Sequence, residues 1–265
     1  MNFNRILIFG DIHGRTFWKE AVEKHMDDVD KVIFLGDYLD YYPDEWEEGD
    51  HTRKDDIDNL LEIIDLKRKY GDKVILLIGN HDQHYRNETF NNYAGGTRRD
   101  NMNAGNIKQI FDEFNDCFQL AYEETIHEQT LELKKEYWEK RVLFTHAGVN
   151  KSWYEKHKDL IGELNADNLN KLDSSKNGQL ALAQLSSYRA WFGEKTGSML
   201  WADVREMMGD PKECINGIYQ IFGHTRLNGK PIITENWACL DCSTPFVLNP
   251  DGELSTLDEM NKHNV

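Results

Sequence analysis

The chain has 265 residues, of which 39% are hydrophobic, and a formal net charge of −16 at pH 7. This composition suffices for a sizeable core, but so acidic a chain lacks the basic face that a non-specific nucleic-acid binder needs, and it does not suit docking on anionic lipid. An acidic protein can still act on phosphates where metal ions supply the positive charge.

The sequence carries no signal for export or membrane insertion. Residues 1–9 have no basic segment followed by a long apolar stretch, and no apolar run is long enough to span a bilayer. The cysteines are too few for a disulfide framework at this length, and the motif Cys239-Leu-Asp-Cys242 is interpreted as structural, because apolar residues alternate around it as in a strand. We therefore expect a cytoplasmic, reduced compartment and no membrane partner.

The first third of the chain alternates between apolar runs and amphipathic segments. Strands are predicted over Ile6–Phe9, Asp30–Leu35 and Lys73–Ile78. Helices are predicted between them, one over about 16–26 with Thr16 as its N-cap and one that is capped by Gly71. This alternation predicts βαβ units with a largely parallel sheet, in which ligands bind at the carboxyl ends of the strands.

The rest of the chain alternates less regularly. A polar, glycine-rich loop over His84–Gly105 is a candidate lid. No repeat, low-complexity tract or linker interrupts the chain, so a single domain over residues 1–265 is expected. The other expected elements are a helix over Ile107–Phe114, strands over Phe118–Ile126, Arg141–Thr145 and Tyr219–Phe222, helices across Lys151–Met208 with breaks at Asn177-Gly178 and Gly193, and a β-rich second sheet over Ile232–Leu257.

Potential metal ligands follow the ends of the predicted strands. They are Asp11 with His13, Asp37, Asn80 with His81, His146, and His224. Carboxylate oxygen, amide oxygen and imidazole nitrogen suit manganese, iron or zinc, and the set contains no cysteine, which argues against a structural zinc site. A single Asp-x-His is a weak signal, but such groups after successive apolar runs are hard to explain as packing.

These residues belong to motifs that resemble those of the calcineurin-like metallophosphoesterases. The motifs are Gly10-Asp11-Ile12-His13-Gly14, Gly36-Asp37-Tyr38-Leu39-Asp40, Gly79-Asn80-His81-Asp82, His146-Ala147-Gly148 and Gly223-His224-Thr225. Within the family the chain is most similar to the branch of serine/threonine phosphoprotein phosphatases and symmetrical diadenosine tetraphosphatases. The resemblance implies an α/β fold, a four-layer αββα sandwich of two mixed sheets flanked by helices, with a dinuclear metal site at the carboxyl ends of strands.

The resemblance also implies a role for each motif residue. Asp11 and His13 hold one divalent ion, and Asp37 bridges two ions. The general acid for the leaving oxygen is His81, which Asp40 holds in place. The ions are manganese, with iron or zinc as alternatives, and a hydroxide between them attacks the phosphorus. The implied ligands of the second ion are Asn80, His146 and His224.

Three of these residues keep a second interpretation. Asp40 could cap the turn that follows it, and Asn80 could be an ordinary turn residue. His81 could be a metal ligand or an inert loop histidine.

One position departs from the branch. Where its members carry a phosphate-binding arginine, this chain has Tyr41. A phenol carries no charge, so another arginine is expected to bind the phosphate. Arg205 is the first candidate and Arg226, two residues after His224, is the second; for each the alternative is a solvent-exposed charge. Arg98 and Arg99 are further candidates.

The expected activity is hydrolysis of phosphate monoesters or phosphoanhydrides, with a phosphorylated small molecule, a nucleotide or a phosphoprotein as substrate. A diadenosine tetraphosphatase or another nucleotide hydrolase is the alternative within this class. A scaffold without catalysis is disfavoured because the ligand set and His81 are complete. A nuclease is disfavoured by the net charge of −16.

Overall fold

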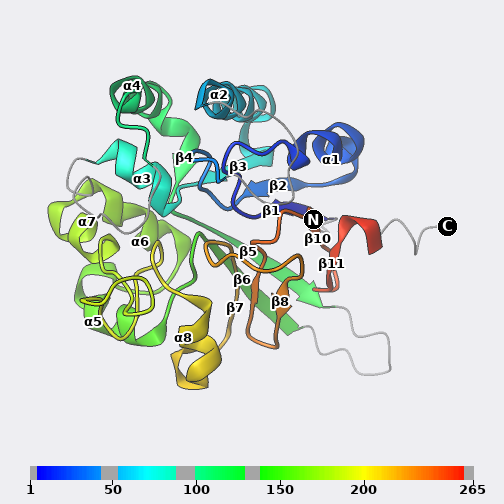
Figure 1. The fold of residues 1–265 in the computed structure, drawn as a ribbon. Coiled ribbons are helices and arrows are strands. Elements are labelled where there is room, and N and C mark those ends of the chain that lie inside the picture. The colour runs from blue at the N-terminus through cyan, green and yellow to red at the C-terminus, as the bar shows by residue number, and fades with distance from the viewer. Residues whose placement is uncertain (1–4, 43–52, 88–98, 129–137, 260–265) are drawn as a thin grey trace, which may run out of the picture.

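A computed structural model describes residues 5–42, 53–87, 99–128 and 138–259. Their strands form two sheets that lie against each other, with helices on the outer sides (Figure 1). Both sheets contain parallel and antiparallel pairs. Within the described part of the chain, no helix combines the length and the apolar character needed to cross a membrane.

The first sheet has six strands in the order β11-β10-β1-β2-β3-β4. The neighbours from β1 to β4 are parallel, whereas β10 and β11 are antiparallel additions at the edge beside β1. The bounds are β1 Ile6–Phe9, β2 Lys31–Phe34, β3 Val74–Leu77, β4 Phe118–Gln119, β10 Phe246–Leu248 and β11 Leu254–Thr256.

The second sheet has five strands in the order β5-β6-β7-β9-β8. Its central strands β6, β7 and β9 are parallel to one another, and β5 and β8 are antiparallel to their neighbours. The bounds are β5 Ala121–Glu128, β6 Trp138–Thr145, β7 Ile218–Phe222, β8 Ile232–Ile233 and β9 Trp237–Cys239.

The helices fall into two groups. Helices α1 (Phe17–His25), α2 (Arg53–Tyr70) and α4 (Ala104–Glu113) lie along the outer face of the first sheet (Figure 1). The helices nearer the second sheet are α5 (Lys151–Ile161), α6 (Ala166–Asn170), α7 (Lys176–Leu182) and α8 (Val204–Gly209), and α3 (Asn80–Arg86) directly follows β3. Short 3₁₀ turns cover Met26–Asp28, Gly71–Lys73, Asn115–Cys117, Lys171–Ser174 and Pro211–Glu213.

The strand sequences explain why the layers form. Successive side chains of β1 point to opposite faces of the sheet: Leu7 and Phe9 belong to the apolar cluster shared with the helices. Ile6 and Ile8 belong instead to a cluster between the two sheets. A third cluster joins α8 to the outer face of the second sheet. These three apolar layers confirm the predicted four-layer α/β fold.

The strand predicted over Phe118–Ile126 is wrong in one respect, because the chain changes sheets within it. Strand β4 pairs with β3 in the first sheet, and β5 pairs with β6 in the second. The side chain of Asn170 secures the crossover: its Oδ1 accepts hydrogen bonds from the backbone N–H groups of Leu120 and Ala121, each at 2.8 Å. A continuous apolar run does not reveal this change of partner.

The tail prediction also needs correction. Residues 232–257 do not form a sheet of their own: β8 and β9 extend the second sheet, while β10 and β11 extend the first. Helix α7 continues through the predicted break at Gly178, where a side chain would come within 2.0 Å of the Leu172 carbonyl oxygen. The glycine is therefore a packing requirement and not a helix end.

Three further predictions concern the N-cap of α1, the segment 183–203 and the candidate lid. Thr16 occupies the N-cap position of α1 but makes no side-chain capping bond there. Residues 183–203 contain turns and no α-helix, contrary to the expectation of helices throughout that region. Of the candidate lid, residues 88–98 lie outside the described residues, and the start of the predicted segment is part of α3.

Candidate active site

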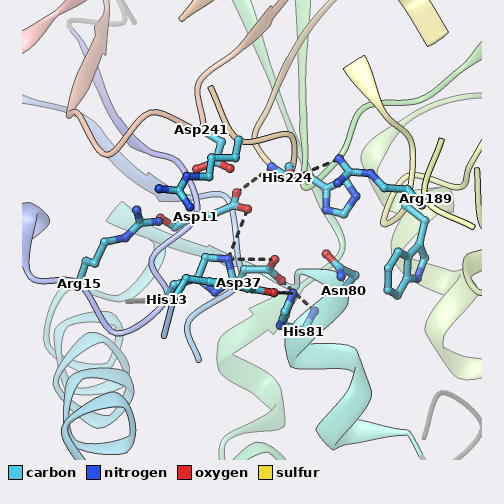
Figure 2. Close-up of a pocket in the computed structure, with 12 residues that line it drawn as sticks. Asp11, His13, Arg15, Asp37, Asn80, His81, Arg189, His224 and Asp241 are labelled. Carbon is cyan, nitrogen blue, oxygen red and sulfur yellow. Dashed lines mark hydrogen bonds and ion pairs between the residues drawn. The ribbon is translucent and has the colours of Figure 1, made fainter. Parts of the chain in front are cut away.

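Polar side chains from both sheets meet at one pocket beside the carboxyl ends of the parallel strands (Figure 2). The pocket has a volume of about 250 Å³. Its wall includes Asp11, His13, Asp37, Asn80, His81 and His224, each from a loop or helix start that directly follows a strand. His146, after β6, is fully buried beneath it.

The loops that carry these side chains adopt unusual backbone conformations. Among the described non-glycine residues, positive φ values occur at His13 (45°), Asp37 (52°), Asp40 (66°) and His224 (64°), and otherwise at Ser243. Each such conformation costs of order 1–3 kcal/mol and persists only where the surroundings enforce it. Strain of this kind, concentrated on the pocket, indicates a functional site.

Two glycines allow carboxylates to approach the backbone. A Cβ at Gly79 would lie 2.0 Å from Oδ1 of Asp37, and one at Gly223 would lie 2.3 Å from Oδ1 of Asp11. The adjoining backbone N–H groups use this space: His81 donates to Asp37 Oδ1 at 2.9 Å, and His224 donates to Asp11 Oδ1 at 2.8 Å. The glycines of these two motifs are therefore needed for the approach itself.

A buried carboxylate, Asp82, ties two of the loops together. Its Oδ2 accepts from the N–H groups of Asp37 (2.7 Å) and Gly79 (2.8 Å), and its Oδ1 accepts from the N–H of Tyr38 (3.0 Å). Burial and the nearby charge of Asp37 raise the pKa of Asp82 to about 7, although these hydrogen bonds lower it. The sequence motif contained Asp82, but its structural role was not predicted.

At one side of the pocket, lone pairs of His13, Asp11 and Asp37 face one another. Nδ1 of His13 lies 2.7 Å from the carbonyl oxygen of Leu39, so this nitrogen carries the proton and Nε2 presents its lone pair. Nε2 lies 3.8 Å from Asp11 Oδ2 and 3.7 Å from Asp37 Oδ2. Burial lowers the pKa of His13 to about 3, which keeps the imidazole neutral. A cation suits this arrangement, whereas a hydrogen bond does not.

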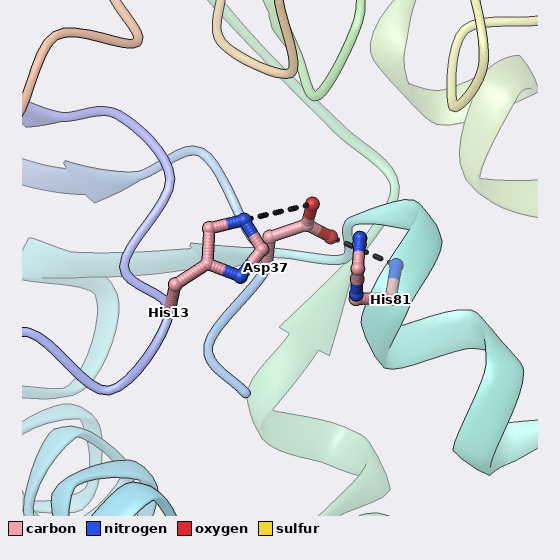
Figure 3. A group of neighbouring side chains, drawn as sticks. All are labelled: His13, Asp37 and His81. Carbon is pink, nitrogen blue, oxygen red and sulfur yellow. Dashed lines mark hydrogen bonds and ion pairs between the residues drawn. The ribbon is translucent and has the colours of Figure 1, made fainter. Parts of the chain in front are cut away.

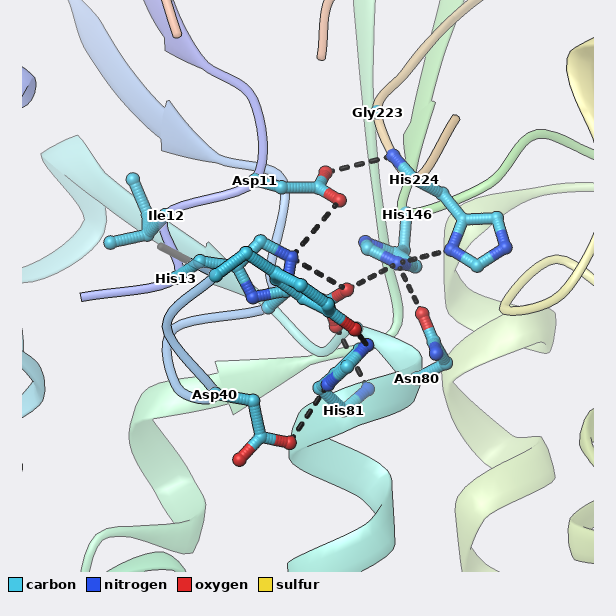
Figure 4. Close-up of polar contacts among 12 residues, drawn as sticks. Asp11, Ile12, His13, Asp40, Asn80, His81, His146, Gly223 and His224 are labelled. Carbon is cyan, nitrogen blue, oxygen red and sulfur yellow. Dashed lines mark hydrogen bonds and ion pairs between the residues drawn. The ribbon is translucent and has the colours of Figure 1, made fainter. Parts of the chain in front are cut away.

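A similar convergence surrounds His146. Its Nδ1 lies 2.9 Å from the carbonyl oxygen of Leu35, and its Nε2 lies 2.9 Å from Asn80 Oδ1, 3.1 Å from His224 Nδ1 and 3.4 Å from Asp37 Oδ2 (Figure 4). One proton on Nε2 cannot serve all three of these neighbours. Backbone contacts of this kind fix the ring orientation of metal-ligating histidines in proteins.

Burial and neighbouring charges shift the pKa values of the residues around His146. Burial lowers the pKa of His146, but the carboxylates of Asp37 and Asp11 raise it to about 10. Burial raises the pKa of Asp11 to about 6. For His224, burial and the nearby Arg189 and His146 hold the pKa well below the usual value, so its imidazole is neutral and can act as a ligand.

Asp37 lies between these two groups of donor atoms. In each group, one nitrogen or oxygen atom from every side chain lies within 4.8 Å of those of the others. The first group consists of His13, Asp37 and His81 (Figure 3), and the second of Asp37, His146 and His224. Burial raises the pKa of Asp37, but the charges of His146 and His81 bring it well below its usual value. The nitrogen and oxygen donors around this ionised carboxylate fit two divalent ions of the manganese, iron or zinc type.

His81 has a different environment from the other histidines. Its Nδ1 lies 2.8 Å from Oδ2 of the fully buried Asp40, which also accepts a hydrogen bond from the Tyr85 hydroxyl. Burial lowers the pKa of His81, but Asp37 and the hydrogen bond with Asp40 produce a net increase. Its Nε2 faces the pocket and lies 3.3 Å from the Tyr42 hydroxyl. The ring is therefore oriented by one carboxylate and keeps its other nitrogen at the pocket.

The predicted arginines lie in different places. Arg226 lines the pocket and is exposed. Arg205 is not among the lining residues: its Nε and Nη2 bind Asp203 at 2.7 and 2.9 Å, its guanidinium lies 4.6 Å from the Tyr188 ring centre, and its side chain is 55% exposed. Arg99 donates to Asn101, and Arg98 lies outside the described residues.

Several pocket residues were missed in the sequence. Arg189 comes from the irregular segment 183–203, which offers no periodic signal, and Arg15 follows the first motif directly. Asp241 follows the apolar strand β9, which is the same signal that identified the other acidic residues. Burial and the charge of Asp11 raise the pKa of Asp241 well above its usual value. The other lining residues are Tyr42 and Trp201.

A family model described as calcineurin-like phosphoesterase matches residues 4–225. The chain belongs to this family. It is a metallophosphoesterase, a phosphoric ester hydrolase, as the resemblance of its motifs implied. No curated protein matches the chain.

One solved structure has a similar fold, and a second is reported with it. A cold-active protein tyrosine phosphatase is 14% identical with a TM-score of 0.52, the match covering 96% of this chain and 79% of that one. A protein serine/threonine phosphatase from Saccharomyces cerevisiae is also 14% identical, with a TM-score of 0.46 and coverage of 97% and 80%. At such identity the first likeness shows the fold alone, and substrate choice has to be argued from the pocket.

Proposed function

We propose that this metallophosphoesterase hydrolyses phosphate monoesters or phosphoanhydrides, in the manner of a serine/threonine phosphatase, with two divalent ions in the pocket. The observation that supports this most is the convergence of electron-rich atoms on both sides of Asp37. In both of the histidines beside Asp37, the far ring nitrogen contacts a backbone carbonyl, so the near nitrogen is left for a cation.

The proposed ligands divide between the two ions. Asp11 and His13 would hold one ion, and Asn80, His146 and His224 the other, with Asp37 shared by both. Manganese is the proposed metal, with iron or zinc as alternatives, because the donors are oxygen and imidazole nitrogen without sulfur. When bound, such ions supply positive charge to the phosphoryl oxygens and lower the pKa of water.

The protein's own residues then account for proton transfer. Water adds to phosphorus while the bond from phosphorus to the leaving oxygen breaks, and the leaving oxygen needs a proton. His81 is proposed to donate it from Nε2, the nitrogen that faces the pocket. Asp40 accepts from Nδ1 at 2.8 Å, which holds the ring in place and favours its protonated form.

The first test is turnover of p-nitrophenyl phosphate by protein that has been stripped of metal and reloaded with manganese, zinc or iron. We expect no turnover in the stripped protein, recovery with a metal, and two ions per chain by elemental analysis. Bis-p-nitrophenyl phosphate is the matched diester substrate. A metal-loaded protein that binds two ions but hydrolyses neither compound would contradict the proposed activity and favour a scaffold.

The finer assignments belong to the same proposal. A screen of phosphopeptides, dinucleoside polyphosphates, nucleotides and sugar phosphates would separate a protein phosphatase from a nucleotide hydrolase. A cytoplasmic location stays a prediction from the cysteine content. We also propose one domain over residues 1–265, because the late strand β10 pairs with β1 in the first sheet.

A further inference from the structure

We infer that Arg189 binds the phosphoryl group of the substrate and makes this pocket selective for a terminal phosphate, that is, a monoester dianion. This inference rests on the proposed function and adds to it a binding residue and a substrate class. It addresses the position where the phosphatase branch has an arginine and this chain has Tyr41.

The guanidinium of Arg189 is held from one side. Its Nη2 donates to Thr225 Oγ1 at 2.8 Å and to the carbonyl oxygen of His224 at 3.4 Å, and its Nε lies 3.1 Å from Asp203 Oδ2. Arg189 therefore contacts the loop that carries His224, and it lies at the wall of the pocket (Figure 2). Within the described part of the chain, no partner is found for its Nη1.

The anchors of Arg189 are themselves fixed. Asp203 is the N-cap of α8, and its backbone N–H donates to Glu206 Oε1 at 2.7 Å in a reciprocal capping arrangement. Thr225 Oγ1 also accepts from the backbone N–H of Val204 at 3.1 Å. An arginine that is already ordered loses less conformational entropy when it binds an anion. The fork geometry of a guanidinium suits two oxygens of one phosphoryl group.

The local charge balance leaves Arg189 able to attract an anion. Asp203 is a single carboxylate that contacts two guanidinium groups, those of Arg189 and Arg205. One positive charge in this trio is therefore not neutralised within it. Arg205 faces outward with a side chain that is 55% exposed, whereas the side chain of Arg189 is 25% exposed and lies at the pocket.

Arg15, another arginine of the pocket lining, is already engaged. Arg15 donates from Nε to the Ile12 carbonyl oxygen (3.1 Å), from Nη1 to Ser243 Oγ (2.5 Å) and from Nη2 to the Asp11 carbonyl oxygen (2.9 Å). All three guanidinium nitrogens of Arg15 therefore have partners already, two of them in its own loop and one at Ser243. Trp201 also lines the pocket, and its buried ring N–H has no hydrogen-bond partner among the described residues.

This arrangement discriminates between substrate classes. A phosphate monoester presents three oxygens besides the ester oxygen, so it can contact the ions and still give an oxygen to Arg189. A diester has one fewer and carries one negative charge instead of two. The contribution of Arg189 should therefore be larger for monoesters than for diesters, because charge-assisted hydrogen bonds strengthen with the charge of the acceptor.

The test compares the wild-type protein with Arg189→Met, Arg189→Lys and Arg141→Met, all loaded with manganese. The matched control is Arg141, which forms a partly buried ion pair with Glu123 at 2.6 Å in β6, outside the pocket. The main measurement is the dissociation constant of inorganic phosphate by calorimetry. Steady-state kinetics on p-nitrophenyl phosphate and bis-p-nitrophenyl phosphate, metal content and melting temperature complete the set.

We expect Arg189→Met to weaken phosphate binding by at least about 10-fold, the effect of losing one charge-assisted contact, with two ions still bound. Its loss in kcat/KM should be greater on the monoester than on the diester. Arg189→Lys should be intermediate, and Arg141→Met should bind phosphate like the wild type. If Arg189→Met alone folds poorly, Arg189→Lys decides, since it keeps the positive charge beside Asp203.

Two results would overturn the inference. The first is a wild-type enzyme that hydrolyses monoesters while both Arg189 variants bind phosphate within twofold of it, which leaves the proposed function intact. The second is a selective loss in Arg205→Met with none in Arg189→Met, which would assign the role to Arg205 as the sequence predicted. A wild-type protein that binds metal but neither binds phosphate nor turns over an ester would overturn both proposals.

Discussion

Replacing Asp40 by asparagine tests whether His81 is the general acid. Asparagine is close in shape to aspartate and, like it, tolerates the positive φ of 66° at this position, so the backbone should be preserved. The change removes the negative charge that faces His81 Nδ1 at 2.8 Å. Since Asp40 is fully buried and also accepts from Tyr85, the single amide oxygen cannot replace both carboxylate oxygens.

The expected magnitude follows from this one contact. A hydrogen bond to a charged group contributes about 1.5–3 kcal/mol, and each 1.4 kcal/mol in a barrier changes the rate about tenfold. We therefore expect kcat on phenyl phosphate, whose leaving group needs a proton, to fall roughly 10- to 150-fold. On p-nitrophenyl phosphate the loss should be at most a few-fold, because that leaving group is stable as an anion.

The assay is steady-state kinetics of the manganese-loaded variant on both substrates, with metal content measured on the same sample. Tyr85→Phe is the control, because it removes a different hydrogen-bond donor to Asp40 but leaves the carboxylate beside His81. That variant should lose stability without changing the ratio of rates on the two substrates. Equal losses for Asp40→Asn on both substrates, at normal metal content, would refute the role of His81 as acid.

Two further predictions concern the metal ions and the backbone around them. Asp37→Asn should lose more bound metal than Asp11→Asn, because Asp37 belongs to both groups of donor atoms and Asp11 is proposed to serve one ion. Elemental analysis of the two variants measures this difference. An active Asp37→Asn enzyme with two ions would contradict the role of Asp37 as a shared ligand. Gly79→Ala should reduce the metal content and the melting temperature, because its Cβ would lie 2.0 Å from Asp37 Oδ1. The control is Gly105→Ala in helix α4, where a Cβ would meet nothing within 4 Å, and this variant should raise the free energy of unfolding by about 0.4–1 kcal/mol. Similar behaviour of the two variants in thermal denaturation would refute the steric argument.

The sequence was informative about the site where each residue acts close to its own strand. Asp11, Asp37, Asn80, His146 and His224 all follow apolar runs, and the ends of parallel strands meet at one edge whatever the lengths of the connections. Spacing therefore identified these residues as neighbours in space.

Features that depend on contacts between distant segments could not be read in this way. The change of sheet at Leu120 depends on Asn170, fifty residues later, and the position of Arg189 depends on Asp203 and Thr225. The conformation of a loop such as 183–203 is set by its partners and not by a repeating pattern of its own. For the same reason Arg205 looked suitable in sequence, although its guanidinium binds Asp203 outside the pocket lining.

If Arg189 binds the phosphate, then phosphate binding and protonation of the leaving group depend on residues from different sheets of this fold. His81, Asp40 and Tyr42 belong to loops of the first sheet and contact one another at one part of the pocket. Arg189 is anchored to Thr225, beyond the end of β7 in the second sheet, and to Asp203 at the start of α8. Asp37 lies between these groups and interacts with donors from both sheets. The leaving group would then be handled by the first sheet and the phosphoryl oxygens by the second. Because the contacts that hold Arg189 go to His224, Thr225 and Asp203, an arginine at this wall can replace the one that the branch carries at position 41 without disturbing the acid.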